Sequence, residues 1–171
     1  ATGTILNDDG SPLYAIGAAS VSEGNTGSVN LVFNVTRTGN AQANETIVVT
    51  TSDGSAANHA SAGSDYSATN TTLTFTSADG ASSTKSFTVP VLGDTIYEGD
   101  ETLVATLSNV VDAVVGTLTS AIATASAIGT IVENDAAPSF SIAAASVTEG
   151  NTGSVNLVFN VTRTGNAQAN E

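Results

Sequence analysis

Acidic side chains are the residues of this 171-residue sequence whose number and spacing could support a specific chemistry. Sixteen Asp and Glu stand against three Lys and Arg, which gives a formal net charge of -13 at pH 7. Many of these acids lie in short loop-like runs, such as GDTIYEGDE from Gly93. Carboxylates gathered in loops repel one another unless a cation lies among them, and calcium prefers oxygen ligands. The first hypothesis is therefore a divalent cation site.

Other kinds of site find little support in the residues. The acidic composition excludes nucleic acid, which needs a basic footprint on its partner. His59 is the only histidine and cysteine is absent, so neither a transition-metal site nor a disulfide is expected. The sequence has no G-x-S-x-G motif, and three Tyr without Trp offer no aromatic cleft for glycoside chemistry. We therefore expect no enzymatic activity.

The strands between the acidic loops must position these carboxylates. Alternating apolar and polar residues predict seven strands, over residues 14–21, 28–38, 46–52, 72–76, 86–92, 102–108 and 127–132. In the second, Val29, Leu31, Phe33 and Val35 share one face. Pro90 predicts an edge position or a bulge for the fifth. Together they predict an all-β fold, a seven-stranded immunoglobulin-like Greek-key β-sandwich.

A long internal repeat shows how this sandwich is used. The segment SVSEGNTGSVNLVFNVTRTGNAQANE from Ser20 returns, with one substitution, from Ser146, 126 residues later. A repeat of this length is a whole domain, so the fold is expected to be tandemly repeated. Proline-containing linkers at 10–12 and 136–138 set the boundaries. Residues 1–10 are expected to end the preceding repeat, 11–137 to form a complete one, and 138–171 to begin an incomplete third.

The direction of the strands sorts the acids by position. If successive strands are antiparallel, their connections alternate between two ends of the sandwich. We call the end that holds the loop after the first strand the near end, and the opposite one the far end. Nine of the twelve acids in residues 11–137 fall at the near end: Glu23, Asp53, Asp65, Asp94, Glu98, Asp100, Glu101, Glu133 and Asp135. Three fall at the far end: Glu45, Asp79 and Asp112.

A series of stretches runs along the chain in the order VSEGNTG, VTRTG, TSDGSA followed by AGSDY, TLTFTSADGASS, GDTIYEGDETLVATLSN and GTIVEND. In this order they resemble the Calx-beta domain, a family found in sodium/calcium exchangers, integrin beta-4 and bacterial surface proteins. The resemblance implies calcium ligands at Glu23, Asp53, Asp94, the backbone carbonyl of Ile96, Glu98, Glu101 and Asp135. All of these lie at the near end, so the resemblance agrees with the strand argument.

Two departures from the family pattern concern the same loops. Gly93 stands where the exchanger pattern has a second adjacent Asp, and the terminal acidic triplet is reduced because Asn134 lies between Glu133 and Asp135. Fewer or weaker calcium sites are therefore expected. Asp65 is expected to shape its turn, and Asp100 to support the ligands without contacting the ion. A solvated acidic face without bound calcium is the alternative.

The leading functional hypothesis is a calcium-binding stalk or filament of a secreted or cell-surface bacterial protein, adhesin-like in organisation. Its partners would be neighbouring repeats of the same protein or further copies in a homopolymeric assembly, with calcium rigidifying each junction. Two alternatives stay open: an adhesive module that contacts a carbohydrate or protein, and a self-assembling filament subunit that exchanges strands without calcium. No apolar stretch reaches membrane-spanning length and no signal peptide is visible, so no membrane insertion is expected in this segment.

Overall fold

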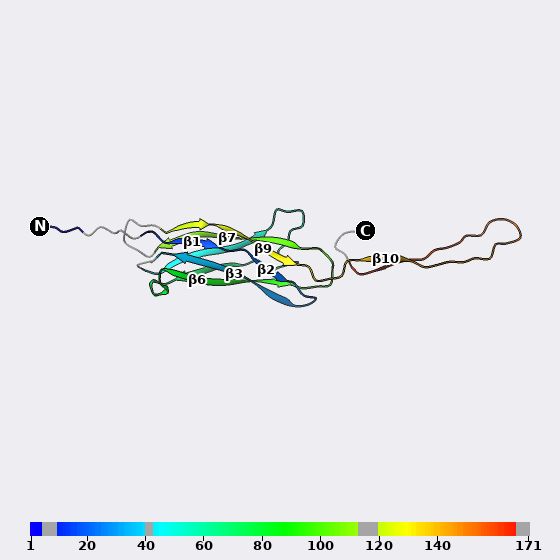
Figure 1. Ribbon diagram of the computed structural model, residues 1–171, viewed down its shortest axis with the longest axis horizontal. Helices are drawn as coiled ribbons and strands as arrows, with labels where there is room; N and C mark the ends of the chain where they lie inside the picture. Colours follow the sequence, from blue (N-terminus) through cyan, green and yellow to red (C-terminus); the bar gives the residue numbers. More distant parts are fainter. Residues whose placement is uncertain (5–9, 40–42, 113–119, 167–171) are drawn as a thin grey trace.

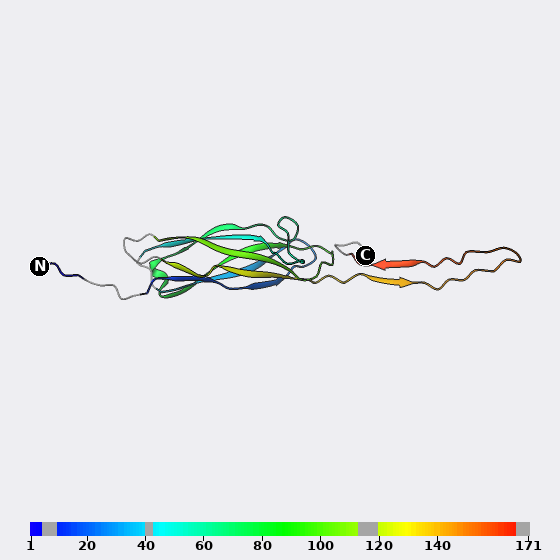
Figure 2. The same cartoon turned by 90° about the horizontal axis from the view of Figure 1, so that it is seen from above.

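Two β-sheets packed face to face form the body of the chain (Figures 1 and 2). The computed structural model describes residues 1–4, 10–39, 43–112 and 120–166. The four-stranded sheet has the order β6-β3-β1-β8, and the five-stranded sheet has the order β2-β9-β7-β4-β5. The elements of the sandwich are β1 (Leu13–Ile16), β2 (Ala19–Ser22), β3 (Ser28–Thr38), β4 (Glu45–Asp53), β5 (Asn70–Phe75), the 3-10 helix η1 (Ser77–Asp79), β6 (Ser82–Leu92), β7 (Glu101–Asp112), β8 (Ala121–Thr124) and β9 (Ser126–Val132).

This arrangement confirms the predicted all-β sandwich. Each of the seven predicted runs coincides with strand structure, and β6 lies at a sheet edge, as Pro90 predicts. No α-helix occurs in the described ranges, and none of their helical structure is long and apolar enough to span a membrane. The predicted flanking segments, 1–10 and 138–171, lie partly outside the described residues.

Two chain segments cross from one sheet to the other, and the sequence pattern did not reveal either crossing. The first predicted strand is divided into β1, in the four-stranded sheet, and β2, in the five-stranded sheet. The last predicted strand is β9, and it is preceded by the additional strand β8 in the opposite sheet. β1 pairs with β8 and β2 with β9, both in parallel. The two crossings therefore close one side of the sandwich.

The core is built from alternate residues of the central strands. Leu31, Phe33 and Val35 of β3 are fully buried, which confirms the predicted inward face of this strand. The ring of Phe33 stacks on that of Phe87 at a centroid distance of 5.2 Å. At the far end the ring of Tyr14 meets that of Phe75 edge to face at 5.1 Å. Such aromatic pairs contribute beyond the area that they bury.

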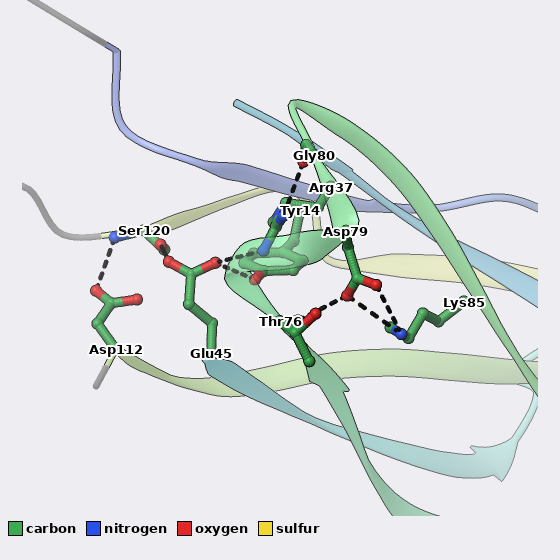
Figure 3. Close-up of polar contacts among 9 residues, drawn as sticks. All are labelled: Tyr14, Arg37, Glu45, Thr76, Asp79, Gly80, Lys85, Asp112 and Ser120. Carbon is green, nitrogen blue, oxygen red and sulfur yellow. Dashed lines mark hydrogen bonds and ion pairs between the residues drawn. The ribbon is translucent and has the colours of Figure 1, made fainter. Parts of the chain in front are cut away.

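A polar network is buried beneath the far end (Figure 3). The guanidinium of Arg37 is fully buried, donates from Nη2 to the carbonyl oxygen of Gly80 at 2.8 Å, and lies 3.6 Å from Glu45 Oε2. The hydroxyls of Tyr14 and Ser120 donate to the two oxygens of the Glu45 carboxylate. Burial, reinforced by the bond to Glu45, raises the pKa of Tyr14 far above its usual value. The buried positive charge of Arg37 and the buried negative charge of Glu45 therefore compensate one another.

A β-hairpin follows the sandwich and extends along its long axis beyond the near end (Figures 1 and 2). It consists of β10 (Ser139–Ile142) and β11 (Val161–Thr164), which pair in the same register as β1 and β3 at positions 126 residues earlier. Phe140 is 57% exposed and Phe159 is 52% exposed, whereas their counterparts Tyr14 and Phe33 are fully buried. The hairpin thus reproduces the pairing that opens the sandwich without the opposing sheet that buries its apolar face.

Replacing Tyr14 by Phe should lower the free energy of unfolding by about 1–3 kcal/mol, because Glu45 loses a hydrogen-bond donor inside the fold. Urea denaturation followed by circular dichroism measures the change. Tyr97→Phe is the matched control, since the Tyr97 side chain is partly exposed. Equal stability of the two variants would show that the buried hydroxyl contributes nothing.

Candidate metal centre

Four chain segments meet at the near end: the turn 23–27, the loops 54–69 and 93–100, and the exit 133–135. Backbone hydrogen bonds join them. Glu23 N donates to Val132 O at 3.3 Å, Gly93 N to Gly27 O at 3.0 Å, and Leu92 N to Asp65 O at 2.9 Å. These contacts confirm the prediction that the acidic loops share one end of the sandwich.

Five carboxylates of these segments, together with that of Glu101 at the start of β7, form two compact groups. Triad I consists of Glu23, Glu133 and Asp135, and triad II of Asp65, Glu98 and Glu101. Within each triad one oxygen from every residue lies within 4.8 Å of the other two. Glu23 in triad I, and Asp65 and Glu101 in triad II, are buried, so each triad contains at least one acid withdrawn from water.

Burial and crowding raise the pKa values of three of these carboxyl groups into the neutral range. Burial, followed by the charge of Glu133, raises the pKa of Glu23 to about 8. Burial and the charge of Asp65 raise the pKa of Glu98 to about 7 and that of Glu101 to about 8. All three groups resist ionisation near neutral pH unless a positive charge comes close, which is the condition that a bound cation supplies.

Glu133 differs from the other triad members because the backbone holds its charge. Its Oε2 accepts hydrogen bonds from Glu98 N at 2.5 Å and Gly99 N at 2.9 Å, and its Oε1 accepts one from Asp135 N at 2.6 Å. Burial alone would raise the pKa of Glu133, but these backbone donors lower it below the usual value. Glu133 is thus a fixed anion that joins triad I to the loop of triad II.

Asp53 and Asp65 both accept hydrogen bonds from the 54–69 loop; the turn role expected of Asp65 is observed, and the ligand role of Asp53 stays a prediction. Asp53 Oδ1 accepts hydrogen bonds from the hydroxyl of Tyr66 at 2.8 Å and from Ala62 N at 2.9 Å, and these bonds hold the pKa of Asp53 below its usual value. Asp65 uses Oδ2 to accept a bond from Ser61 N at 2.6 Å and also belongs to triad II. Asp53 therefore organises the 54–69 loop, while Asp65 combines a turn contact with a place among the clustered acids.

The remaining predicted positions lie beside the triads. Asp94 Oδ1 accepts a hydrogen bond from Ile96 N at 2.7 Å, and the charge of Asp94 contributes to raising the pKa values of Glu23 and Glu98. The carbonyl of Ile96 stays a predicted ligand. Asp100 Oδ1 accepts a bond from Glu133 N at 3.0 Å, which suits its expected supporting role.

Packing explains the glycine at position 93. A Cβ atom built on Gly93 would lie 2.2 Å from the carbonyl oxygen of Gly24 and 3.1 Å from that of Glu23. Cβ atoms do not approach backbone that closely, so the 23–27 turn occupies the space that any side chain would need. An aspartate at position 93 is therefore incompatible with this packing, and the oxygen ligands must come from elsewhere in the near end.

Oxygen donors are the only ligand type that the triads offer, and this donor set suits a hard divalent cation. Calcium takes about six to eight oxygens in a flexible geometry, and each triad supplies up to six carboxylate oxygens before backbone or water is counted. Magnesium demands a stricter octahedral arrangement. The residues present therefore fit calcium.

A family model for the Calx-beta domain matches residues 17–135, which include both triads. The chain belongs to the Calx-beta domain family. No curated protein matches it.

Solved Calx-beta structures share the fold. The apo-form Calx CBD1 domain has 24% sequence identity and a TM-score of 0.57, over 73% of this chain and 99% of that one. CBD12 from CALX1.2 has 25% identity and a TM-score of 0.56, and calcium binding domain CBD12 of CALX1.1 has 24% and 0.53. Both of these matches cover 72% of this chain, but only 46% and 44% of the other chains, so the present chain matches less than half of either CBD12 structure.

The structure brings four of the seven predicted ligands into the triads: Glu23, Glu98, Glu101 and Asp135. Asp65 and Glu133 complete the triads, although neither was a predicted ligand. The antiparallel order of the strands predicts that both lie at the near end, so the sequence does carry a signal for their position. Their distances from the other acids depend on how the 54–69 loop and the exit fold back.

The raised carboxyl pKa values predict how metal-free stability depends on pH. Glu23, Glu98 and Glu101 bind protons more tightly in the folded chain than in the unfolded chain. Their contribution to stability is therefore complete at about pH 4 and is lost as the pH rises through about 7 to 8. In metal-depleted buffer the melting temperature should fall between pH 5 and pH 8.

Circular dichroism melts across this range measure the effect. Glu101→Gln should weaken the pH dependence, because one of the shifted groups is gone. Glu149→Gln, at an exposed position of the hairpin region, should leave it unchanged. A melting temperature that stays constant or rises from pH 5 to pH 8 would contradict the assignment.

Proposed function

We propose that this Calx-beta domain is a calcium-binding structural repeat of a secreted or cell-surface bacterial protein, and that calcium at its near end rigidifies the junction with the following repeat. The observation that carries the proposal is the convergence of six carboxylates, in two partly buried triads, at the end from which the chain leaves the sandwich. The proposed role of the domain is calcium binding, and neither triad suggests catalysis.

The charge distribution supports calcium binding at this end. Arg37 and Lys85, the two basic residues of the 11–137 segment, both take part in far-end contacts. Within the triads, three carboxyl groups have pKa values of about 7 to 8, so folding without a cation leaves repulsion that protons relieve only in part. Calcium would remove this repulsion, and the calcium binding domain CBD12 of CALX1.1 shares the fold.

The path of the chain supports a role at the junction. Triad I includes Asp135, and the linker to the hairpin follows directly. In the 93–100 loop, Tyr97 N donates to the carbonyl oxygen of Asn166, just beyond β11 of the hairpin, at 3.2 Å. The same loop carries Asp94 and Glu98. An ion that orders this loop would thus also order a backbone contact with the following repeat.

Isothermal calorimetry on the full chain tests calcium binding. The wild-type chain should give saturable heat, and Glu101→Gln should weaken the affinity at least about tenfold because triad II loses a charged oxygen ligand. The control Glu149→Gln should bind like the wild type. Absence of saturable heat from the wild-type chain would overturn the proposed function.

Small-angle X-ray scattering tests the junction. Calcium should narrow the range of orientations between sandwich and hairpin, so that the maximum dimension becomes better defined than in chelator. Glu101→Gln at the same calcium concentration should behave more like the chelated chain. Identical scattering with and without calcium, in a chain whose calorimetry shows binding, would overturn the role at the junction alone.

A further inference from the structure

Asn58 lies in the loop between β4 and β5, and its side chain reaches the opposite acidic loop. Its Nδ2 donates to the carbonyl oxygen of Glu98 at 3.2 Å and to that of Asp100 at 2.8 Å. These carbonyls flank Gly99, whose φ of 81° bends the chain. One amide group therefore holds both sides of this bend.

The N–H groups of the bend are also bound, by a second side chain. Glu133 Oε2 accepts hydrogen bonds from the N–H groups of Glu98 and Gly99, while Asn58 binds carbonyl oxygens of the same segment. Donors and acceptors of the bend are thus both satisfied by side chains from other segments. Glu98 and Glu101, which stand on either side of the bend, belong to triad II.

The loop that carries Asn58 also supplies Asp65, the third member of triad II. It is docked on β7 by a bond from Ala60 N to Thr102 O at 3.0 Å, and Asp65 is oriented by the bond from Ser61 N. Asn58 therefore ties together the two loops that contribute acids to this triad. Without the tie, the 98–101 segment would be fixed to the 54–69 loop through fewer contacts.

We propose that Asn58 is a positioning residue for triad II: it does not bind calcium, but its two hydrogen bonds set the spacing between Asp65 on one loop and Glu98 and Glu101 on the other. This inference rests on the proposed calcium function. Partners that orient metal ligands typically change metal affinity by about 10- to 100-fold when they are removed.

Asn58→Asp separates positioning from charge. Aspartate has nearly the same shape, but it replaces the amide donor by an oxygen that faces two carbonyl oxygens, and it adds a negative charge. If Asn58 mattered only through local charge, this variant would bind calcium more tightly than the wild type. If Asn58 positions the loop, the variant binds more weakly despite the added charge.

Calcium calorimetry on the full chain compares the wild type with Asn58→Ala, Asn58→Asp and Asn58→Gln. We expect about 10- to 100-fold weaker binding for the Ala and Asp variants and partial recovery for Gln, which restores the donor on a longer side chain. Asn34→Ala, on the exposed face of β3, is the control and should bind like the wild type. Because Asn58 is exposed, the metal-free melting temperature of Asn58→Ala should change little.

The outcomes separate the two proposals. No saturable heat from the wild-type chain overturns calcium binding, and the role of Asn58 with it. Normal wild-type binding together with unchanged affinity in Asn58→Ala, or tighter binding in Asn58→Asp, overturns the role of Asn58 alone. If circular dichroism shows that the Ala variant is unfolded, the Asp and Gln variants decide: weaker binding by Asp than by Gln supports positioning, and equal or tighter binding by Asp overturns it.

Discussion

Repulsion among buried carboxylates is the constraint on which the near end depends. Three backbone donors fix the charge of Glu133, and this fixed charge makes ionisation of Glu23 harder. The loops around the triads are joined by bonds that do not neutralise the acids, such as that from Gly24 N to Asn134 Oδ1. The backbone thus brings the negative charges together, and their compensation depends on cations or protons from the solvent.

At the far end, by contrast, acidic side chains lie beside basic ones. There Arg37 lies beside Glu45, and Lys85 pairs with Asp79 at 3.2 Å, so each base meets an acid from the same chain. The ring of Phe75 lies 5.7 Å from both cationic groups. Two of the three far-end acids therefore lie beside a base, whereas the near end holds neither Arg37 nor Lys85. This asymmetry gives a direction to the domain.

Much of the fold was predictable because its signals are local. Alternation located the strands, and the antiparallel order of strands assigned the acids to two ends. Local alternation could not reveal that β1 and β8 lie in a different sheet from β2 and β9, because a strand that crosses between sheets keeps apolar residues toward one shared core. The crossings depend on parallel pairings between strands more than 100 residues apart.

The candidate site was predictable as a region but not as a geometry. Asp53 ends β4 and Asp65 lies in a turn of the loop that follows, and nothing nearby in sequence indicates that the buried hydroxyl of Tyr66 binds Asp53. Likewise, Glu133 is held beside the triads by hydrogen bonds from N–H groups more than 30 residues away in the sequence. The resemblance to Calx-beta domains identified the acidic loops, whereas packing decided which of their carboxylates meet.

The hairpin that repeats the β1–β3 pairing has a consequence for folding. Residues 23–45 and 149–171 are identical, so β6 has two candidate partners of the same sequence, its own β3 and the identical segment 154–164. Synthesis from the amino terminus resolves the choice, because β3 and β6 both emerge before the second candidate exists. Refolding from denaturant removes that order in time. Because the two segments are identical, the order in which the strands become available during folding, as well as the stability of the final fold, determines whether β6 pairs with β3.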